Sequence, residues 1–259
     1  MPTITTLEKP PRRALHIFYV LDTSGSMAGA PIATLNRAME ETVEVLRKQA
    51  KSNADAELKI AVLQFNSGAK WVQPNGPEDM EDFIWEDLSA GGLTDVGAAL
   101  KELDSKLSRN AYLSSMTGAY LPVIIFMSDG YATDDYQKAL AQIRQNKWFA
   151  RGTKIGFALG DDPDMKMISE VVGNCEAVVK TDDLDLFARL IKFASVTSSM
   201  LCSTSRTSAE SVTGATVIED AIDQGVAPAS VVNTNVNYTP EPTIANTSSG
   251  DGWDDDDWD

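Results

Sequence analysis

The sequence has few residues of the kinds that mark disulfide-rich and nucleic-acid-binding proteins. Its 259 residues include 2 cysteines, Cys175 and Cys202, which do not form a Cys-x-x-Cys pair. The 22 lysines and arginines are outnumbered by 38 aspartates and glutamates, which gives a net charge of −16. Nucleic acids and anionic membranes attract basic surfaces. The composition therefore excludes a disulfide framework and argues against both of those partners.

Long hydrophobic runs are also missing. The N-terminal stretch MPTITTLEKPPRR has no apolar segment of the kind found in signal peptides, and no run approaches 18 apolar residues. We therefore expect a cytoplasmic protein. The negative charge is uneven, because eleven acidic residues and one basic residue follow from Ser203 onward. This stretch is otherwise rich in Ser, Thr, Asn, Val and Pro, which predicts a flexible acidic extension.

Up to residue 202, apolar runs alternate with helical patterns. This alternation predicts an α/β fold, with a doubly wound, mostly parallel sheet covered by helices on both faces. We expect an N-terminal extension at 1–12, one domain at 13–202 and a low-complexity tail at 203–259 that ends in an Asp/Trp segment. The predicted strands are 14–22, 57–65, 70–73, 121–130, 154–160 and 177–180. The predicted helices are 31–50, 78–88, 94–107, 134–146, 163–172 and 184–201.

Oxygen-bearing side chains follow several of these strands. In an open α/β sheet, ligands bind beyond the carboxyl ends of the strands. Taken singly, each group is also typical of a helix cap or an ordinary turn. Their occurrence together at one predicted edge favours a binding site. The groups are Asp22, Ser24 and Ser26; Thr94 and Asp95 after Gly91-Gly92; and Ser128, Asp129 and Gly130.

Carboxylates and hydroxyls with no sulfur or imidazole nearby in the sequence form a hard donor set. Such a set suits Mg²⁺ or Mn²⁺ better than zinc. With few carboxylates around it, the cation keeps much of its charge and leaves one position open. We therefore expect it to capture an acidic group from another molecule.

Asp22-x-Ser24-x-Ser26, the Gly-Gly-Leu-Thr94 turn and the turn at 128–130 together resemble the metal-ion-dependent adhesion site of von Willebrand factor A domains. The resemblance covers about residues 12 to 200. It implies that Ser24 and Ser26 bind the cation directly and that Thr94 binds directly or through water. It also implies that Asp22 and Asp129 act mostly through water. The function it implies is metal-dependent protein–protein interaction rather than catalysis.

Two longer stretches, VLDTSGSMAGAPIATLN and MSDGYATDDYQKALAQIRQNKWF, resemble the TerY-type branch linked to tellurite resistance and chemical stress. This resemblance implies a bacterial stress-response system whose other members are a Ser/Thr protein kinase and a metal-dependent phosphatase. Tyr131-Ala132 departs from the acidic or amide residue and proline expected there. The acidic tail also lacks the Cys/His cluster of some relatives.

The partner surface is expected around the metal position and in the tail. Four residues near the site are predicted to contact the partner: Met27, Gly92, Asp95 and Tyr131. In the tail, Trp253 and Trp258 stand among aspartates, a pattern typical of a short docking segment. Three alternatives stay open for this tail: it aids solubility, it docks onto a separate partner, or it places an aspartate in its own metal site.

The sequence also bears on two other functions. A hydrolase of the Gly-x-Ser-x-Gly type centred on Ser26 would need glycines where Ser24 and Ala28 stand. The single histidine, His16, lies roughly 20 Å before Asp22 along the strand, at about 3.3 Å per residue, and is expected near the other end of the sheet. An Asp-x-Asp phosphoryl-transfer motif and a P-loop are both absent. The other alternative is a scaffold in which the metal is structural and the acidic tail binds the partner.

Overall fold

The structure is a computed structural model that describes residues 12–115, 118–204 and 212–232. Within these residues the chain forms one seven-stranded sheet in the order β3-β2-β1-β5-β6-β7, with β4 paired to β2. Pairing is parallel throughout except for β3 and β4, which run antiparallel to β2. The strands are β1 (Arg13–Asp22), β2 (Ala56–Asn66), β3 (Gly68–Trp71), β4 (Glu78–Asp79), β5 (Val123–Ser128), β6 (Thr153–Leu159) and β7 (Val178–Thr181).

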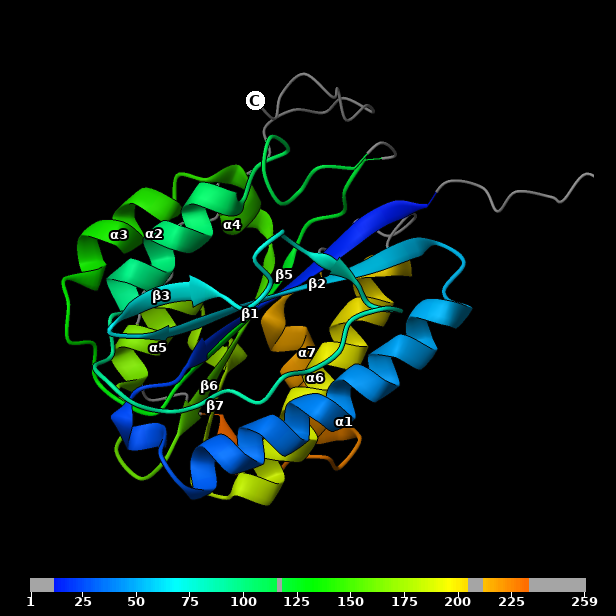
Figure 1. Ribbon diagram of the computed structural model, residues 1–259. Helices are drawn as coiled ribbons and strands as arrows, with labels where there is room; N and C mark the ends of the chain where they lie inside the picture. Colours follow the sequence, from blue (N-terminus) through cyan, green and yellow to red (C-terminus); the bar gives the residue numbers. More distant parts are fainter. Residues whose placement is uncertain (1–11, 116–117, 205–211, 233–259) are drawn as a thin grey trace, which may run out of the picture.

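Helices cover both faces of this sheet, as the sequence predicts (Figure 1). One layer contains α1, α6 and α7, and the opposite layer contains α2 to α5. The expected doubly wound α/β class is therefore confirmed. The α-helices are α1 (Ala30–Ser52), α2 (Val96–Lys106), α3 (Tyr136–Ile143), α4 (Lys147–Arg151), α5 (Met165–Val172), α6 (Leu184–Thr204) and α7 (Gly214–Asp223), and the short 3₁₀ turns are η1 (Gly25–Met27), η2 (Cys175–Ala177) and η3 (Ala229–Val231).

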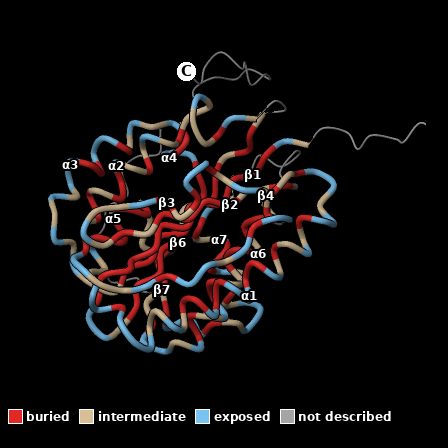
Figure 2. The backbone as a smooth tube through the Cα atoms, viewed as in Figure 1, coloured by how far each residue is buried: buried red, intermediate tan, exposed pale blue. Residues whose placement is uncertain are grey.

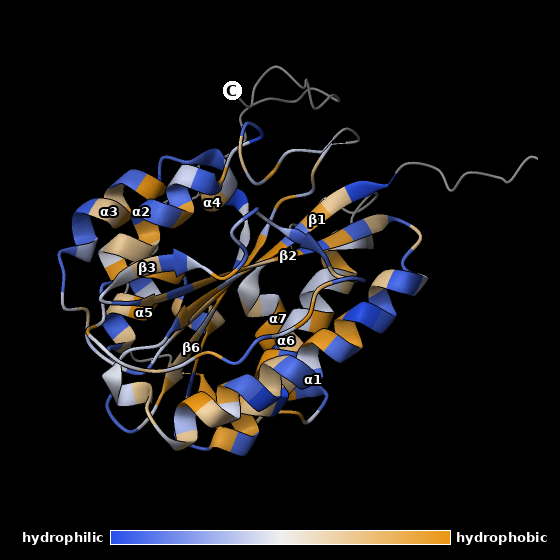
Figure 3. Ribbon diagram, viewed as in Figure 1, coloured by the Kyte–Doolittle hydropathy of each residue, from blue (hydrophilic) through white to orange (hydrophobic). Residues whose placement is uncertain are grey.

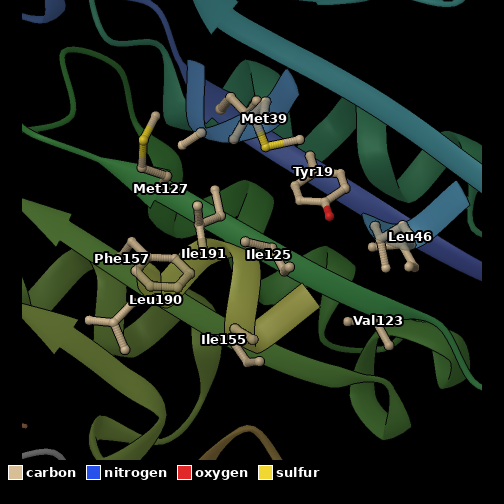
Figure 4. Packing of buried hydrophobic residues seen from close by; sticks show 14 of the residues in the cluster. Tyr19, Met39, Leu46, Val123, Ile125, Met127, Ile155, Phe157, Leu190 and Ile191 are labelled. Carbon is tan, nitrogen blue, oxygen red and sulfur yellow. The ribbon is translucent and has the colours of Figure 1, made fainter. Parts of the chain in front are cut away.

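The central strands are buried on both sides, which explains their near-continuous apolar sequences (Figure 2). Alternate residues of β1 enter two separate cores: Tyr19 and Leu21 face α1 and α6, whereas Phe18 and Val20 face α2 and α3. Figure 4 shows the first of these cores, where Tyr19 lies among residues of α1, α6 and the neighbouring strands. The polar end of Tyr19 is satisfied there, because its hydroxyl donates to Ser195 Oγ at 2.8 Å.

The helices are amphipathic, with apolar residues toward the sheet and hydrophilic residues outward (Figure 3). Among the described residues, no helix is both long and apolar enough to cross a membrane.

The segment 78–88 differs from the predicted helix. Its first two residues form β4, and no helix follows before Leu88. The physical reason is a tertiary contact, because the Asn36 side chain of α1 bonds both backbone groups of Leu88: Nδ2 donates to its carbonyl and Oδ1 accepts from its N–H, each at 2.9 Å. Met80 and Phe83 are buried in the core at a short turn after β4, where Phe83 N–H donates to Asp79 O at 3.0 Å. The apolar spacing of this segment therefore reflects contact with the core, but the segment is irregular and not helical.

The chain also does not lose regular structure at residue 202. The helix α6 continues to Thr204, and α7 places Val217, Ile218 and Ala221 in the core beside α6. A capping box between Thr213 and Thr216 starts α7, although the usual sequence signature has Glu or Gln where Thr216 stands. The prediction of a low-complexity tail is therefore wrong for residues 212–232. The Asp/Trp segment at 251–259 lies outside the described residues.

His16 lies near the start of β1, fully buried beside Phe18, at the end of the sheet where it was expected. Neither ring nitrogen has a hydrogen-bond partner among the described residues. The pKa of His16 is lowered from 6.5 to about 4, mainly by burial and also by the positive charge of Lys59, while Asp79 opposes both. The histidine is therefore kept neutral at neutral pH.

This burial predicts a pH-dependent loss of stability. Because the unfolded chain binds the proton at a higher pH than the folded chain, stability should fall as the pH drops from about 6.5 toward 4. Between pH 7.5 and 4.5 the contribution is about 2.5 kcal/mol. Urea unfolding of wild type and His16→Phe at pH 7.5 and 4.5 measures this contribution, since the two proteins share all other titrating groups. An equal loss in the two proteins would show that His16 does not carry the effect.

Candidate functional site

The candidate site lies where the strand order reverses. After β1 the chain adds β2 and β3 on one side, whereas β5, β6 and β7 lie on the other side. The crevice between β1 and β5, at their carboxyl ends, is therefore the topological switch point of the sheet, where α/β folds bind ligands. Asp22 ends β1 and Ser128 ends β5, so both residues lie at this point.

Asp22 is fixed by hydrogen bonds to both carboxylate oxygens. Ser128 Oγ donates to Asp22 Oδ2 at 2.6 Å, and the backbone N–H of Ser24 donates to Asp22 Oδ1 at 2.8 Å. Both Asp22 and Ser128 are fully buried. The carboxylate thus forms the floor of the site and holds the start of the Ser24–Ser26 turn in place.

Ser24, Ser26 and Asp129 continue this arrangement as a row of oxygen atoms. The hydroxyl oxygens of Ser24 and Ser26 are 3.0 Å apart, and Ser26 Oγ donates to Asp129 Oδ1 at 2.8 Å. Ser24 is buried, Asp129 is half-buried and Ser26 is exposed. The short turn η1 produces this geometry, because it brings alternate side chains to one side. The row therefore runs from the floor of the site to the protein surface.

The loop that carries Thr94 is tied to the same turn through backbone hydrogen bonds. Gly91 N–H donates to Thr23 O at 2.8 Å, and Gly25 N–H donates to Gly92 O at 3.1 Å. Gly92 has φ +88°, and a Cβ there would lie 2.7 Å from Ser67 Oγ, so this tight turn needs glycine. Thr94 itself is only 6% exposed. Four of the five predicted ligands thus form one hydrogen-bonded row, and the loop of the fifth packs against it.

The electrostatics of the two carboxylates favour a bound cation. Burial raises the pKa of Asp22, although hydrogen bonds from Ser128 and Ser24 oppose the rise, and the charge of Asp129 adds to it. Burial also raises the pKa of Asp129, opposed by the hydrogen bond from Ser26. A cation between them would offset the cost of keeping both charged. In the part of the chain that the structure describes, no cluster of three His, Cys, Asp or Glu could hold a metal. Binding here would therefore depend on the hydroxyls.

The predicted partner residues differ in their availability. Gly92 is exposed, and Tyr131 is 56% exposed with its hydroxyl donating to Asp162 Oδ2 at 3.4 Å. Asp95 is half-buried and accepts hydrogen bonds from Gly68 N–H and Thr133 Oγ1. The prediction that Met27 contacts the partner is corrected. Its side chain is fully buried in the core against α1, so a partner has no access to it. The predicted contacts Trp253 and Trp258 lie outside the described residues.

Sequence reasoning missed Leu93, which is 56% exposed directly beside Thr94. Leu93 lies in the loop before α2 and Tyr131 in the loop after β5, and both are among the few large hydrophobic side chains that the described structure leaves exposed. The signal was present in the Gly-Gly-Leu-Thr turn, where an apolar residue stands in a loop. Leu93 and Tyr131 therefore give exposed apolar surface to the two loops that carry Thr94 and Asp129.

Residues 16–190 match the family model of the von Willebrand factor type A domain. This match covers more than half of the chain, so the protein belongs to that family. Domains of this family are commonly metal-dependent protein-interaction modules, and the sequence resemblance to the family is confirmed.

Solved structures agree on the fold. Proximal thread matrix protein 1 from the mussel byssus, solved with a zinc-occupied metal-ion-dependent adhesion site, is 17% identical with a TM-score of 0.53, over 70% of this chain and 47% of its own. A von Willebrand factor type A protein from Catenulispora acidiphila is 16% identical with a TM-score of 0.52, over 71% and 42%. The ArnB paralogue VWA2 from Sulfolobus acidocaldarius is 14% identical with a TM-score of 0.52, over 71% and 46%. This chain therefore spans less than half the length of each of these proteins.

Proposed function

We propose that this protein is a metal-dependent protein-interaction module that binds an acidic side chain of a partner. The observation that carries the proposal is the row of oxygen atoms from Asp22 through Ser24 and Ser26 to Asp129 at the switch point of the sheet. A hydrogen-bonded row that only stabilised the core would lie inside it, whereas the outer end of this row is exposed. Hydroxyls that reach solvent beside two partly desolvated carboxylates suit cation binding.

Ser24 and Ser26 would hold the cation directly and Thr94 directly or through water, with Asp22 and Asp129 around them. Mg²⁺ or Mn²⁺ fits this set, because every donor is a hard oxygen and neither sulfur nor imidazole takes part. The zinc in the byssus protein makes zinc a competitor to test. A cation with few charged ligands supplies an unmet positive charge to a carboxylate. Leu93 and Tyr131 would pack against apolar residues that flank the partner's carboxylate.

The biological setting is the finer part of the proposal. The TerY-type stress branch, its kinase and phosphatase partners and a cytoplasmic location rest on the sequence likeness alone. We also propose that the protein is not an enzyme, since His16, its one histidine, is buried at the other end of β1 from Asp22. The scaffold alternative, with a structural metal and a binding tail, is separated from this proposal by the experiment below.

Replacing Thr94 with alanine should abolish partner capture while reducing metal affinity by about tenfold or less. The reason is that Thr94, on its own loop, would complete the cation's coordination toward the partner, whereas Ser24 and Ser26 remain to hold the cation. Pull-down with and without EDTA, and calorimetry with Mg²⁺ and Mn²⁺, measure the two effects. Thr42→Ala is a matched control, because its hydroxyl bonds within α1 to Ala38 O.

Capture that survives both EDTA and Thr94→Ala would contradict the proposal and support the scaffold alternative. Equal losses of metal and partner would reduce Thr94 to a structural ligand.

A further inference from the structure

The loop between β5 and α3 makes a second contact with the Thr94 loop, beyond Asp129. Thr133 N–H donates to Thr94 O at 2.9 Å, and Thr94 N–H donates to Thr133 Oγ1 at 3.0 Å. Both backbone polar groups of Thr94 therefore bond to the same residue. The loop that ends β5 thus carries one candidate ligand, Asp129, and also holds the backbone of another.

The Thr133 hydroxyl is used twice. It donates its single proton to Asp95 Oδ1 at 2.9 Å, which leaves its lone pairs to accept from Thr94 N–H. The other oxygen of Asp95 accepts from Gly68 N–H at 2.8 Å, and Asp95 N–H donates to Asn66 O at 2.9 Å. The chain of bonds therefore ties three loops together around Thr94.

Asp134, the next residue, holds the helix that follows Thr94. Its Oδ1 accepts from Gly97 N–H and its Oδ2 from Ala98 N–H, each at 2.9 Å. Asp95, the N-cap of α2, makes no capping bond with its side chain, so a residue from another loop satisfies the first turn. A Cβ on Gly97 would lie 2.8 Å from Asp134 Oδ2. The glycine leaves room for this approach.

We propose that Thr133 and Asp134 are positioning residues that hold Thr94 at a fixed place relative to Asp129. The proposal rests on the proposed metal site. Neither residue touches the cation; they act through the backbone of the Thr94 loop and the start of α2. A cation site needs its ligands held in place before binding, and outer residues that hold them change affinity by about 10–100-fold.

The burial pattern separates this role from a purely structural one. Thr133 is exposed, so removing its hydroxyl opens no cavity, and the two hydrogen bonds that it loses, with Thr94 N–H and Asp95 Oδ1, are part-buried and exposed. Its effect on global stability should be small. A loss of metal affinity without a loss of stability would therefore report on the placement of Thr94.

The test compares three variants by free Mn²⁺ electron paramagnetic resonance and by amide exchange. Thr133→Val keeps the shape and removes the hydroxyl, and it should weaken Mn²⁺ binding about tenfold and speed exchange of the Thr94 amide. Thr133→Ser keeps the hydroxyl and should restore binding to within about threefold of wild type. Thr153→Val is the matched control. Thr153 begins β6, far from the site, and its hydroxyl donates to Val212 O.

Wild-type affinity in Thr133→Val, or an equal loss in Thr133→Ser, would overturn the positioning role. If wild type itself fails to bind Mn²⁺, the proposed function is overturned. Amide exchange tests the positioning role independently of metal binding. Unchanged exchange at Thr94 in Thr133→Val overturns the role, and faster exchange supports the conclusion that Thr133 holds the Thr94 backbone.

Discussion

Replacing Ser26 with alanine should reduce the affinity for Mg²⁺ or Mn²⁺ about 100-fold while leaving the fold intact. Ser26 Oγ lies in the middle of the oxygen row, 3.0 Å from Ser24 Oγ and 2.8 Å from Asp129 Oδ1. Its removal therefore interrupts the row and deletes a direct ligand. Outer residues of metal sites already cost about 10–100-fold, so a direct ligand should lie at or above the top of that range. Because Ser26 is exposed, no cavity forms.

Isothermal calorimetry with each metal gives the affinity, and circular dichroism checks the fold. Ser105→Ala is a suitable control, since Ser105 is an exposed serine on α2 whose hydroxyl donates to Glu102 O. If Ser26→Ala binds both metals as wild type does, Ser26 is not a ligand and the proposed site is wrong.

Replacing Gly214 with alanine should destabilise the protein by about 3 kcal/mol or more. A Cβ at this position would collide with the backbone carbonyl oxygen of Lys154 in β6 and lie 2.8 Å from Ala177 Cβ. The strand β6 is paired to β5 at Lys154 and to β7 from Gly156 onward, so these pairings resist its displacement. Relief would require α7 to leave the core, which would expose Val217 and Ile218.

Urea unfolding measures the loss, with Gly91→Ala as the control, because a Cβ on Gly91 meets nothing within 4 Å. Near wild-type stability for Gly214→Ala would mean that α7 does not pack as described. Metal affinity should stay unchanged in folded Gly214→Ala. Gly91→Ala is a control for stability alone, since Gly91 belongs to the loop at the site.

Much of the fold was predictable because its central strands carry their own signal. The strands β1 and β5 are buried on both faces and so are apolar almost throughout, and the helices between strands are amphipathic. The segment 78–88 was predicted wrongly because its backbone bonds to other elements, to β2 at its start and to the Asn36 side chain at Leu88, and spacing does not reveal such tertiary contacts. The helix α7 was missed because it is short, follows a polar stretch and has Thr216 where the capping-box signature has Glu or Gln.

The oxygen row was predictable because its members directly follow strands that meet at one edge. The surroundings were not. Met27 stands within the motif but is buried by α1, whereas Leu93 is exposed beside Thr94. The role of Thr133 depends on where two loops cross, and only the folded backbone places its hydroxyl between Thr94 N–H and Asp95. Sequence spacing therefore located the donors, and tertiary structure decided what holds and borders them.

The central claim is that a divalent cation binds at the hydroxyl row, and a crystal grown with millimolar Mn²⁺ tests it most directly. Anomalous scattering locates manganese independently of any assumed ligands. One strong peak is expected within about 2.5 Å of both Ser24 Oγ and Ser26 Oγ, with Asp22 and Asp129 around it. A peak among other side chains, or none at the row while manganese binds elsewhere, would show that the hydroxyl row is not the cation site.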